Sequence, residues 1–183
     1  MAPGASTSFT APACHQSDRL KQRHAIRACG LPADALLARY RGDGSYTDCY
    51  VTEVSRPVSQ AEYVEAFYTS GVFNLERLIL KLLVARPSTD QQARELAAGR
   101  RDSFAAWSVE ARAPDQLLLC DFRGRTRSWL STSGTRLYFG SAVVPVASRG
   151  SRKAGLGFTF RALLGFHRLY SRVLLQAAVR RLR

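Results

Sequence analysis

The last third of this 183-residue chain contains no acidic residue. Residues 122–183 hold 12 arginines and one lysine, whereas residues 1–121 hold 12 arginines and 2 lysines against all 14 carboxylates. The whole formal charge of +13 therefore belongs to the C-terminal third. A surface of one sign attracts anionic partners through a field that salt weakens, so an anionic membrane surface and a nucleic acid are both alternatives to ordinary solvated arginines.

Long apolar runs and known catalytic motifs are also missing. The longest uncharged stretch near the C-terminus, residues 173–179, is far shorter than the roughly 20 residues that a spanning helix needs. Residues 1–30 contain no apolar run like that of a secretory signal, so we expect a cytoplasmic protein. No GxSxG, HExxH, Walker or GxGxxG motif occurs, and the sequence alone does not decide whether the protein is an enzyme.

The four cysteines form no CxxC pair and follow no regular spacing. Neither a zinc ribbon nor a disulfide framework is therefore indicated, and the pattern is typical of a reducing compartment. We expect no metal site and no cofactor. The cysteines are Cys14, Cys29, Cys49 and Cys120.

The composition predicts one folded domain after a short tail. Hydrophobic residues make up 46% of the chain, with 9 Phe, 7 Tyr and 2 Trp, which is typical of a packed globular protein. Residues 1–30 are rich in Pro, Gly, Ser and Ala without periodicity, and we expect them to be disordered. The predicted domain therefore spans residues 31–183.

The first half of this domain changes from a strand pattern to helical patterns. Ser59 with Glu62 has the spacing of a capping box, and Asn74 is placed to cap a further helix. Gly71 and Pro87 end the first two of these helices. The predicted elements are a short helix in 32–40, a strand at 46–54, and helices at 59–70, 74–86 and 88–99.

The second half returns to strands at a spacing of about ten residues. Short connections, among them Arg123-Gly124 and Ser133-Gly134, force neighbouring strands to run antiparallel. The predicted strands cover residues 103–111, 116–123, 125–133 and 135–146.

A sheet with an apolar face needs a cover, and the segment from residue 158 to 182 has the length for it. At 1.5 Å per residue this helix spans about 37 Å. Its polar stripe runs through Arg168, Arg172, Gln176 and Arg180, with apolar residues on the remaining surface. The sequence therefore predicts an α+β fold: a curved antiparallel sheet gripped by a long C-terminal helix, with short helices after the first strand. The same pattern would also suit a helix lying on a membrane surface.

The segments DQLLLCDFRGRTRSWLSTSGTRLYFGSAVVP and FRALLGFHRLYSRVLLQAAVRRL, taken with this order of elements, resemble a bacterial family of unknown function. The arrangement is similar to the helix-grip fold of the START, polyketide-cyclase and Bet v 1 superfamily, also called SRPBCC. The resemblance implies a ligand space between the sheet and the long helix, lined by apolar and aromatic side chains with a few polar ones. It carries over no catalytic residue.

Two groups of residues are candidates for a site. Alternation along the strand puts Arg125, Arg127 and Trp129 on one side, where they face either a cavity, as an anion site, or water, as a solvated stripe. His167 is a candidate acid or base, with Asp121 or Tyr138 as its partner, although a hydrogen-bonded core histidine is the alternative. Six residues are predicted to contact a ligand: Arg125, Arg127, Trp129, Tyr138, His167 and Tyr170.

The sequence thus predicts a domain that binds a small hydrophobic or amphipathic molecule, with an anion among the candidates, between the sheet and the C-terminal helix. Two alternatives stay open at this point. One is an enzyme of the cyclase or dehydratase kind that uses His167, and the other is a peripheral binder of anionic membranes or nucleic acid through the basic third.

Overall fold

A computed structural model describes residues 25–42, 44–74, 88–144 and 158–183, with side chains from residue 168 onward in the last segment. The helix predicted at 74–86 falls almost entirely outside these residues. The elements are β1 (Arg27–Ala28), the 3-10 helix η1 (Leu36–Tyr40), β2 (Tyr46–Glu53), α2 (Gln60–Tyr68), α4 (Asp90–Ala97), β3 (Ser103–Phe104), β4 (Trp107–Ala113), β5 (Gln116–Asp121), β6 (Thr126–Ser133), β7 (Arg136–Val143) and α5 (Phe158–Arg181).

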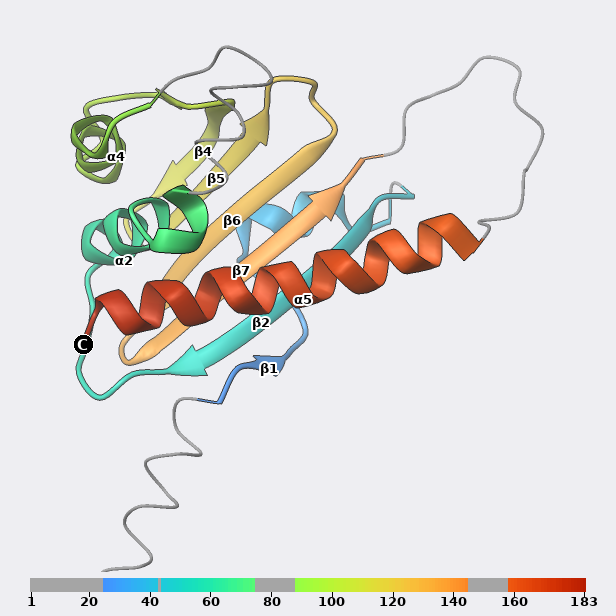
Figure 1. Ribbon diagram of the computed structural model, residues 1–183, viewed down its shortest axis with the longest axis horizontal. Helices are drawn as coiled ribbons and strands as arrows, with labels where there is room; N and C mark the ends of the chain where they lie inside the picture. Colours follow the sequence, from blue (N-terminus) through green and yellow to red (C-terminus); the bar gives the residue numbers. More distant parts are fainter. Residues whose placement is uncertain (1–24, 43, 75–87, 145–157) are drawn as a thin grey trace, which may run out of the picture.

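The strands form one open, curved sheet in the order β1-β2-β7-β6-β5-β4-β3, and every neighbouring pair is antiparallel. Figure 1 shows α2, α4 and α5 on one face of this sheet, with α5 crossing in front of β2 and β7. The predicted fold class, an antiparallel sheet covered by a C-terminal helix, is confirmed.

Two short strands extend the sheet beyond the five that the sequence predicts. The stretch predicted as one strand at 103–111 is a hairpin, because Ala105 adopts a φ of 53° and turns the chain between β3 and β4. β1 lies within the predicted tail, yet Arg27 pairs with Val51 and Ala28 with Tyr50. The sheet therefore includes residues from before the predicted start of the domain.

Capping boxes begin the two described helices that follow β2. The Ser59 hydroxyl accepts a hydrogen bond from the Glu62 amide, and the Glu62 carboxylate accepts one from the Ser59 amide at 2.9 Å. Thr89 and Gln92 make the same pair of bonds in α4, which begins within the helix predicted at 88–99. Each box satisfies amide groups that a helix start leaves without partners.

The main core lies between the sheet and the three helices. Aromatic rings fill its centre: Phe67 of α2 lies 5.0 Å from Phe139 of β7 between ring centroids, and Tyr68 lies 4.8 Å from Phe73. Leu119 and Leu130 of the sheet are fully buried against them. Edge-on and tilted ring pairs of this kind stabilise a core beyond the area that they bury.

The opposite face of the sheet is covered by the segment that contains η1, which contacts β5, β6 and β7 (Figure 1). Leu37 and Trp129 are fully buried there. The buried Gln116 side chain joins the layers, because its Oε1 accepts from the Leu36 amide at 2.8 Å and from Trp129 Nε1 at 2.9 Å, while its Nε2 donates to the Asp34 carbonyl at 3.1 Å. Both faces of the central strands are therefore buried.

Gly140 of β7 is the point of closest approach on this second face. A Cβ atom at this position would lie 2.9 Å from Leu37 Cδ2, 3.0 Å from Trp129 Cε3 and 3.1 Å from the Asp48 carbonyl oxygen. Contacts this short force a neighbouring group to move.

We predict that Gly140→Ala lowers the free energy of unfolding by about 1–3 kcal/mol, as overpacking of a filled core does. Urea denaturation followed by tryptophan fluorescence measures the change. Gly30→Ala is the matched control, because a Cβ there meets nothing within 4 Å. Equal stability of the two variants would show that the second face is loosely packed.

Candidate functional site

The inner side of α5 is filled where its side chains are described. Leu174, Leu175, Ala178 and Val179 are all at most 4% exposed and belong to the main core. They pack against α2 and against β2 and β7. Over residues 168–183, side chains therefore occupy the space between helix and sheet where the sequence predicts a ligand.

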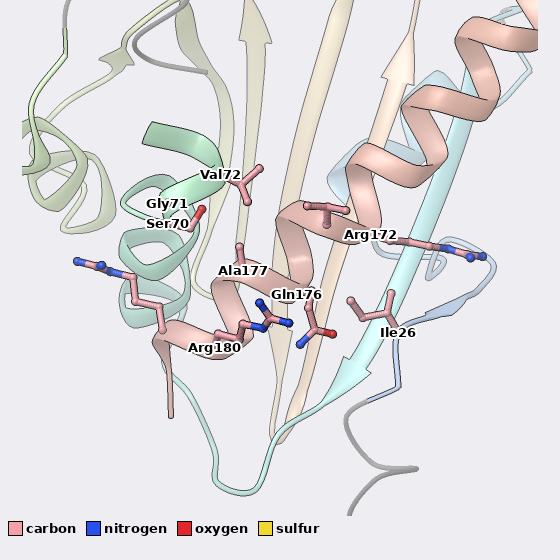
Figure 2. A pocket seen from close by; sticks show the side chains of 10 residues that line it. Ile26, Ser70, Gly71, Val72, Arg172, Gln176, Ala177 and Arg180 are labelled. Carbon is pink, nitrogen blue, oxygen red and sulfur yellow. The ribbon is translucent and has the colours of Figure 1, made fainter. Parts of the chain in front are cut away.

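A concave site lies instead on the outer flank of this helix. It is an open groove of about 770 Å³ between α5, the turn after α2 and the residue that precedes β1 (Figure 2). The residues from α5 recur at steps of one and three, so they form one stripe along the helix. The groove is lined by Ile26, Ser70, Gly71, Val72, Arg172, Val173, Gln176, Ala177, Arg180 and Arg181.

The groove combines aliphatic walls with a positive charge. Three of its ten lining residues are arginines and none is acidic. Arg172 Cζ lies 5.4 Å from the centroid of the Tyr50 ring, a cation–π contact that holds the guanidinium over β2. Arg181 also borders a second depression that contains Glu62 and Glu65. The positive charge available to an anion in the groove therefore comes mainly from Arg172 and Arg180.

Figure 2 shows how these groups lie. The side chains of Gln176 and Arg180 extend from α5 at the same end of the groove and Ile26 lies beyond Gln176. Ser70 and Val72 face them from the end of α2 and from the helical residues 71–74 that follow it. An amide and a guanidinium are both hydrogen-bond donors, and the groove wall beside them is aliphatic. The arrangement can accept an anionic group next to an apolar one.

Arg127, a predicted ligand contact, takes part in a buried ion cluster. Its Nε donates to Glu110 Oε2 at 2.5 Å and lies 2.8 Å from the Tyr40 hydroxyl, which itself donates to Glu110 Oε1 at 2.6 Å. The side chains of Arg127 and Glu110 are only 12% and 20% exposed. Burial and the hydrogen bond to Glu110 raise the pKa of Tyr40, so its hydroxyl stays a donor at neutral pH.

The strand side that carries Arg127 and Trp129 faces neither water nor a cavity. The segment around η1 covers it, so that Trp129 is fully buried and its ring centroid lies 6.2 Å from that of Tyr138. Arg125 lies apart from them, exposed in the turn between β5 and β6. The structure therefore brings Arg127, Trp129 and Tyr138 to one sheet face but not around a described pocket.

Two of the three residues predicted to act in acid–base chemistry have structural roles. Asp121 Oδ1 accepts hydrogen bonds from the Arg125 and Thr126 amides at 2.6 and 2.8 Å, which closes the β5–β6 turn. Tyr138 belongs to the cluster on the sheet face away from α5. His167 is on α5, and its side chain lies outside the described residues. Tyr170, also on α5, packs half-buried against the main core.

No pattern in the sequence indicates three of the residues in these sites. Glu110 and Tyr40 meet Arg127 across 17 and 87 residues of chain, and no local pattern marks such a contact. Ile26 reaches the groove because β1 joins the sheet. The sequence indicates only the side of the groove that α5 forms, because Arg172, Gln176 and Arg180 recur with the period of a helix.

Comparison with known proteins finds no matching family model, no matching curated protein and no matching solved structure. Among the residues whose structure is described, none of the helices combines the length and the apolar character that crossing a bilayer requires. The same residues contain no group of three or more His, Cys, Asp or Glu side chains that could hold a metal ion.

We predict that Glu110→Gln lowers the free energy of unfolding by about 1–3 kcal/mol, because it leaves the buried Arg127 guanidinium without a charged partner. Urea denaturation measures the loss. Asp102→Asn is the control: it removes an ion pair of 3.5 Å to Arg112 in which the Asp102 side chain is 84% exposed, and such pairs contribute less than about 1 kcal/mol. Equal effects of the two substitutions would contradict a structural role for the buried cluster.

Proposed function

We propose that this domain binds a small amphipathic anion in the groove on the flank of α5. The class of ligand is an aliphatic chain that ends in a carboxylate or a phosphate. One observation carries the proposal: a groove of about 770 Å³ whose ten lining residues include three arginines and no acid. Pockets that bind small molecules have volumes of about 300–1,000 Å³.

The walls of the groove suit the aliphatic part of such a ligand. Ile26, Val72, Val173 and Ala177 offer apolar surface from three separate segments of the chain. Val173 is 41% exposed, so its side chain is accessible to a ligand chain in the groove. Covering these side chains with a ligand chain removes apolar area from water and stabilises the complex.

The polar residues of α5 suit the anionic head. Arg172 and Arg180 are eight residues apart, so about 12 Å of helix separates them and Gln176 lies between. A guanidinium binds carboxylate and phosphate oxygens through two parallel N–H donors. A ligand with its head at Arg180 and its chain toward Val173 would use both features of the groove.

In the same proposal we assign the domain to the helix-grip class, because the order of one long strand, helices, an antiparallel meander and a closing helix is the order of that fold. The groove lies on the outer flank of α5, outside the space between sheet and helix that the resemblance implies. The class of ligand therefore follows from the residues that line the groove.

Dodecyl phosphate below its micellar concentration is the probe for this groove. We predict saturable binding by isothermal titration calorimetry and an approximately twofold to tenfold higher Kd for Arg180→Gln, since a contact of this kind contributes about 0.5–1.5 kcal/mol. Arg123→Gln is the matched control, because it removes the same charge from an exposed turn outside the groove. Dodecyl maltoside, with the same chain and no charge, should bind more weakly.

Equal Kd values for Arg180→Gln and Arg123→Gln would show that any bound anion lies outside the groove. Binding of dodecyl maltoside as tightly as dodecyl phosphate would show that the groove does not select a charged head. Either result contradicts the proposal.

A second candidate function is attachment to an anionic membrane surface, and one observation favours it. Leu169 is 63% exposed on α5 next to Arg168, and Val173 and Arg172 repeat this pair one turn later. Apolar side chains flanked by arginines are the elements with which a helix binds the interface of an anionic bilayer.

We predict that the protein sediments with phosphatidylglycerol vesicles, that raising the salt concentration releases it, and that Leu169→Ser weakens this binding. Phe122→Ser is the control, since it removes a 44% exposed apolar side chain from the β5–β6 turn. If both variants sediment like the unchanged protein, or if none of the three binds, the membrane function is ruled out in favour of the soluble ligand.

A further inference from the structure

Two cysteine side chains meet where β1 joins the sheet. The register pairs Ala28 with Tyr50, and at the next position the Cys29 amide donates to the Cys49 carbonyl at 3.0 Å. Their Sγ atoms lie 3.3 Å apart, and both cysteines are free. Directly opposed residues of an antiparallel pair have Cβ atoms about 4.5–5.5 Å apart, close to the roughly 3.5–4.5 Å of a disulfide.

We propose that Cys29 and Cys49 form a reversible disulfide that fastens β1 to β2. The sulfurs need to approach by about 1.3 Å to reach the bond length of about 2.0 Å. The inference goes beyond the proposed function, because it requires no ligand in the groove. The irregular spacing of the cysteines in the sequence does not indicate that Cys29 and Cys49 lie together.

The two thiols differ in access. Cys29 is half-buried directly after β1, whereas Cys49 is 3% exposed beneath the segment that contains η1. Burial and the contact with the Cys29 thiol raise the pKa of Cys49 well above its usual range. An oxidant in solution therefore reaches Cys29 first, and Cys49 is placed to react with the product.

With a hydroperoxide as the oxidant, the reaction balances in two steps. The Cys29 thiolate attacks one oxygen of hydrogen peroxide, the O–O bond breaks, and a sulfenic acid and water result once the departing hydroxide takes up a proton. The Cys49 sulfur then displaces the sulfenic hydroxyl, which leaves as a second water with the Cys49 proton. Two electrons pass from the two sulfurs to one peroxide, and a thiol reductant reverses the change.

The disulfide would close a loop that has a structural role. Residues 30–48 lie between the two cysteines and include η1 and Leu37, which cover the second face of the sheet. Ile26, three residues before Cys29, lines the groove. A covalent link at this point therefore holds both the cover of the second face and one wall of the groove against β2.

The test treats the full-length protein with one equivalent of hydrogen peroxide and maps its peptides by mass spectrometry without reduction. We expect a Cys29–Cys49 cross-linked peptide, its loss after addition of dithiothreitol, and a Tm about 5–10 °C higher in the oxidised protein. Hydrogen exchange in residues 25–30 should slow on oxidation, which reports directly on the attachment of β1.

Cys29→Ser should abolish the cross-link and the rise in Tm, and it is the main variant because the side chain is half-buried. Cys49→Ala gives a second test with a small apolar residue at the buried position. Cys120→Ser is the matched control: this half-buried thiol of β5 donates to the Asp121 carbonyl, and its loss should leave the cross-link intact. Sulfinic acid at Cys29, or a disulfide only through Cys14 or Cys120, would overturn the proposal.

Discussion

The architecture depends on a single buried amide. Gln116 sits at the start of β5 with 7% of its surface exposed, and all three of its hydrogen bonds connect the segment around η1 to the sheet or orient the indole of Trp129. A buried polar group needs hydrogen-bond partners for all of its donors and acceptors. The bonds of the Gln116 amide therefore hold the segment around η1 in one position on the sheet. The sheet thereby becomes the middle layer of three, with the segment around η1 on one face and the helices on the other.

The arginines that carry the positive charge lie in two different environments. Arg127 is neutralised inside the protein by Glu110, and its contact with Tyr40 makes it part of the packing. Arg172 and Arg180 have no such carboxylate in the groove. The net charge of the chain does not distinguish these two cases. An arginine inside the protein needs a carboxylate of the same chain beside it, whereas an arginine in an open groove attracts anions from solution.

Local signals in the sequence predicted the elements well, and contacts between distant segments were missed. The Ser59 capping box, the glycine turns of the meander and the period of α5 each depend on residues within a few positions, so the helices and most strands were predictable. The left-handed turn at Ala105 was not, because only the packing around β3 favours it over a continuous strand. The groove and the Arg127 cluster were missed because each depends on a contact between segments far apart in the chain: Ile26, beside the edge strand β1, lines the groove, and Tyr40 of η1 bonds to Arg127.

The sheet ends at both sides in strands of only two residues, β1 and β3. Long strands at an edge expose a row of unpaired backbone groups that can add a strand from another molecule. Here the eight-residue β2 is screened by β1 at one end, and β4 is interrupted by a register shift between Val109 and Ala111. Short edges and an irregular strand beside one of them reduce the surface on which copies of this protein could align into a continuous sheet, so the strands that complete the sheet also oppose aggregation.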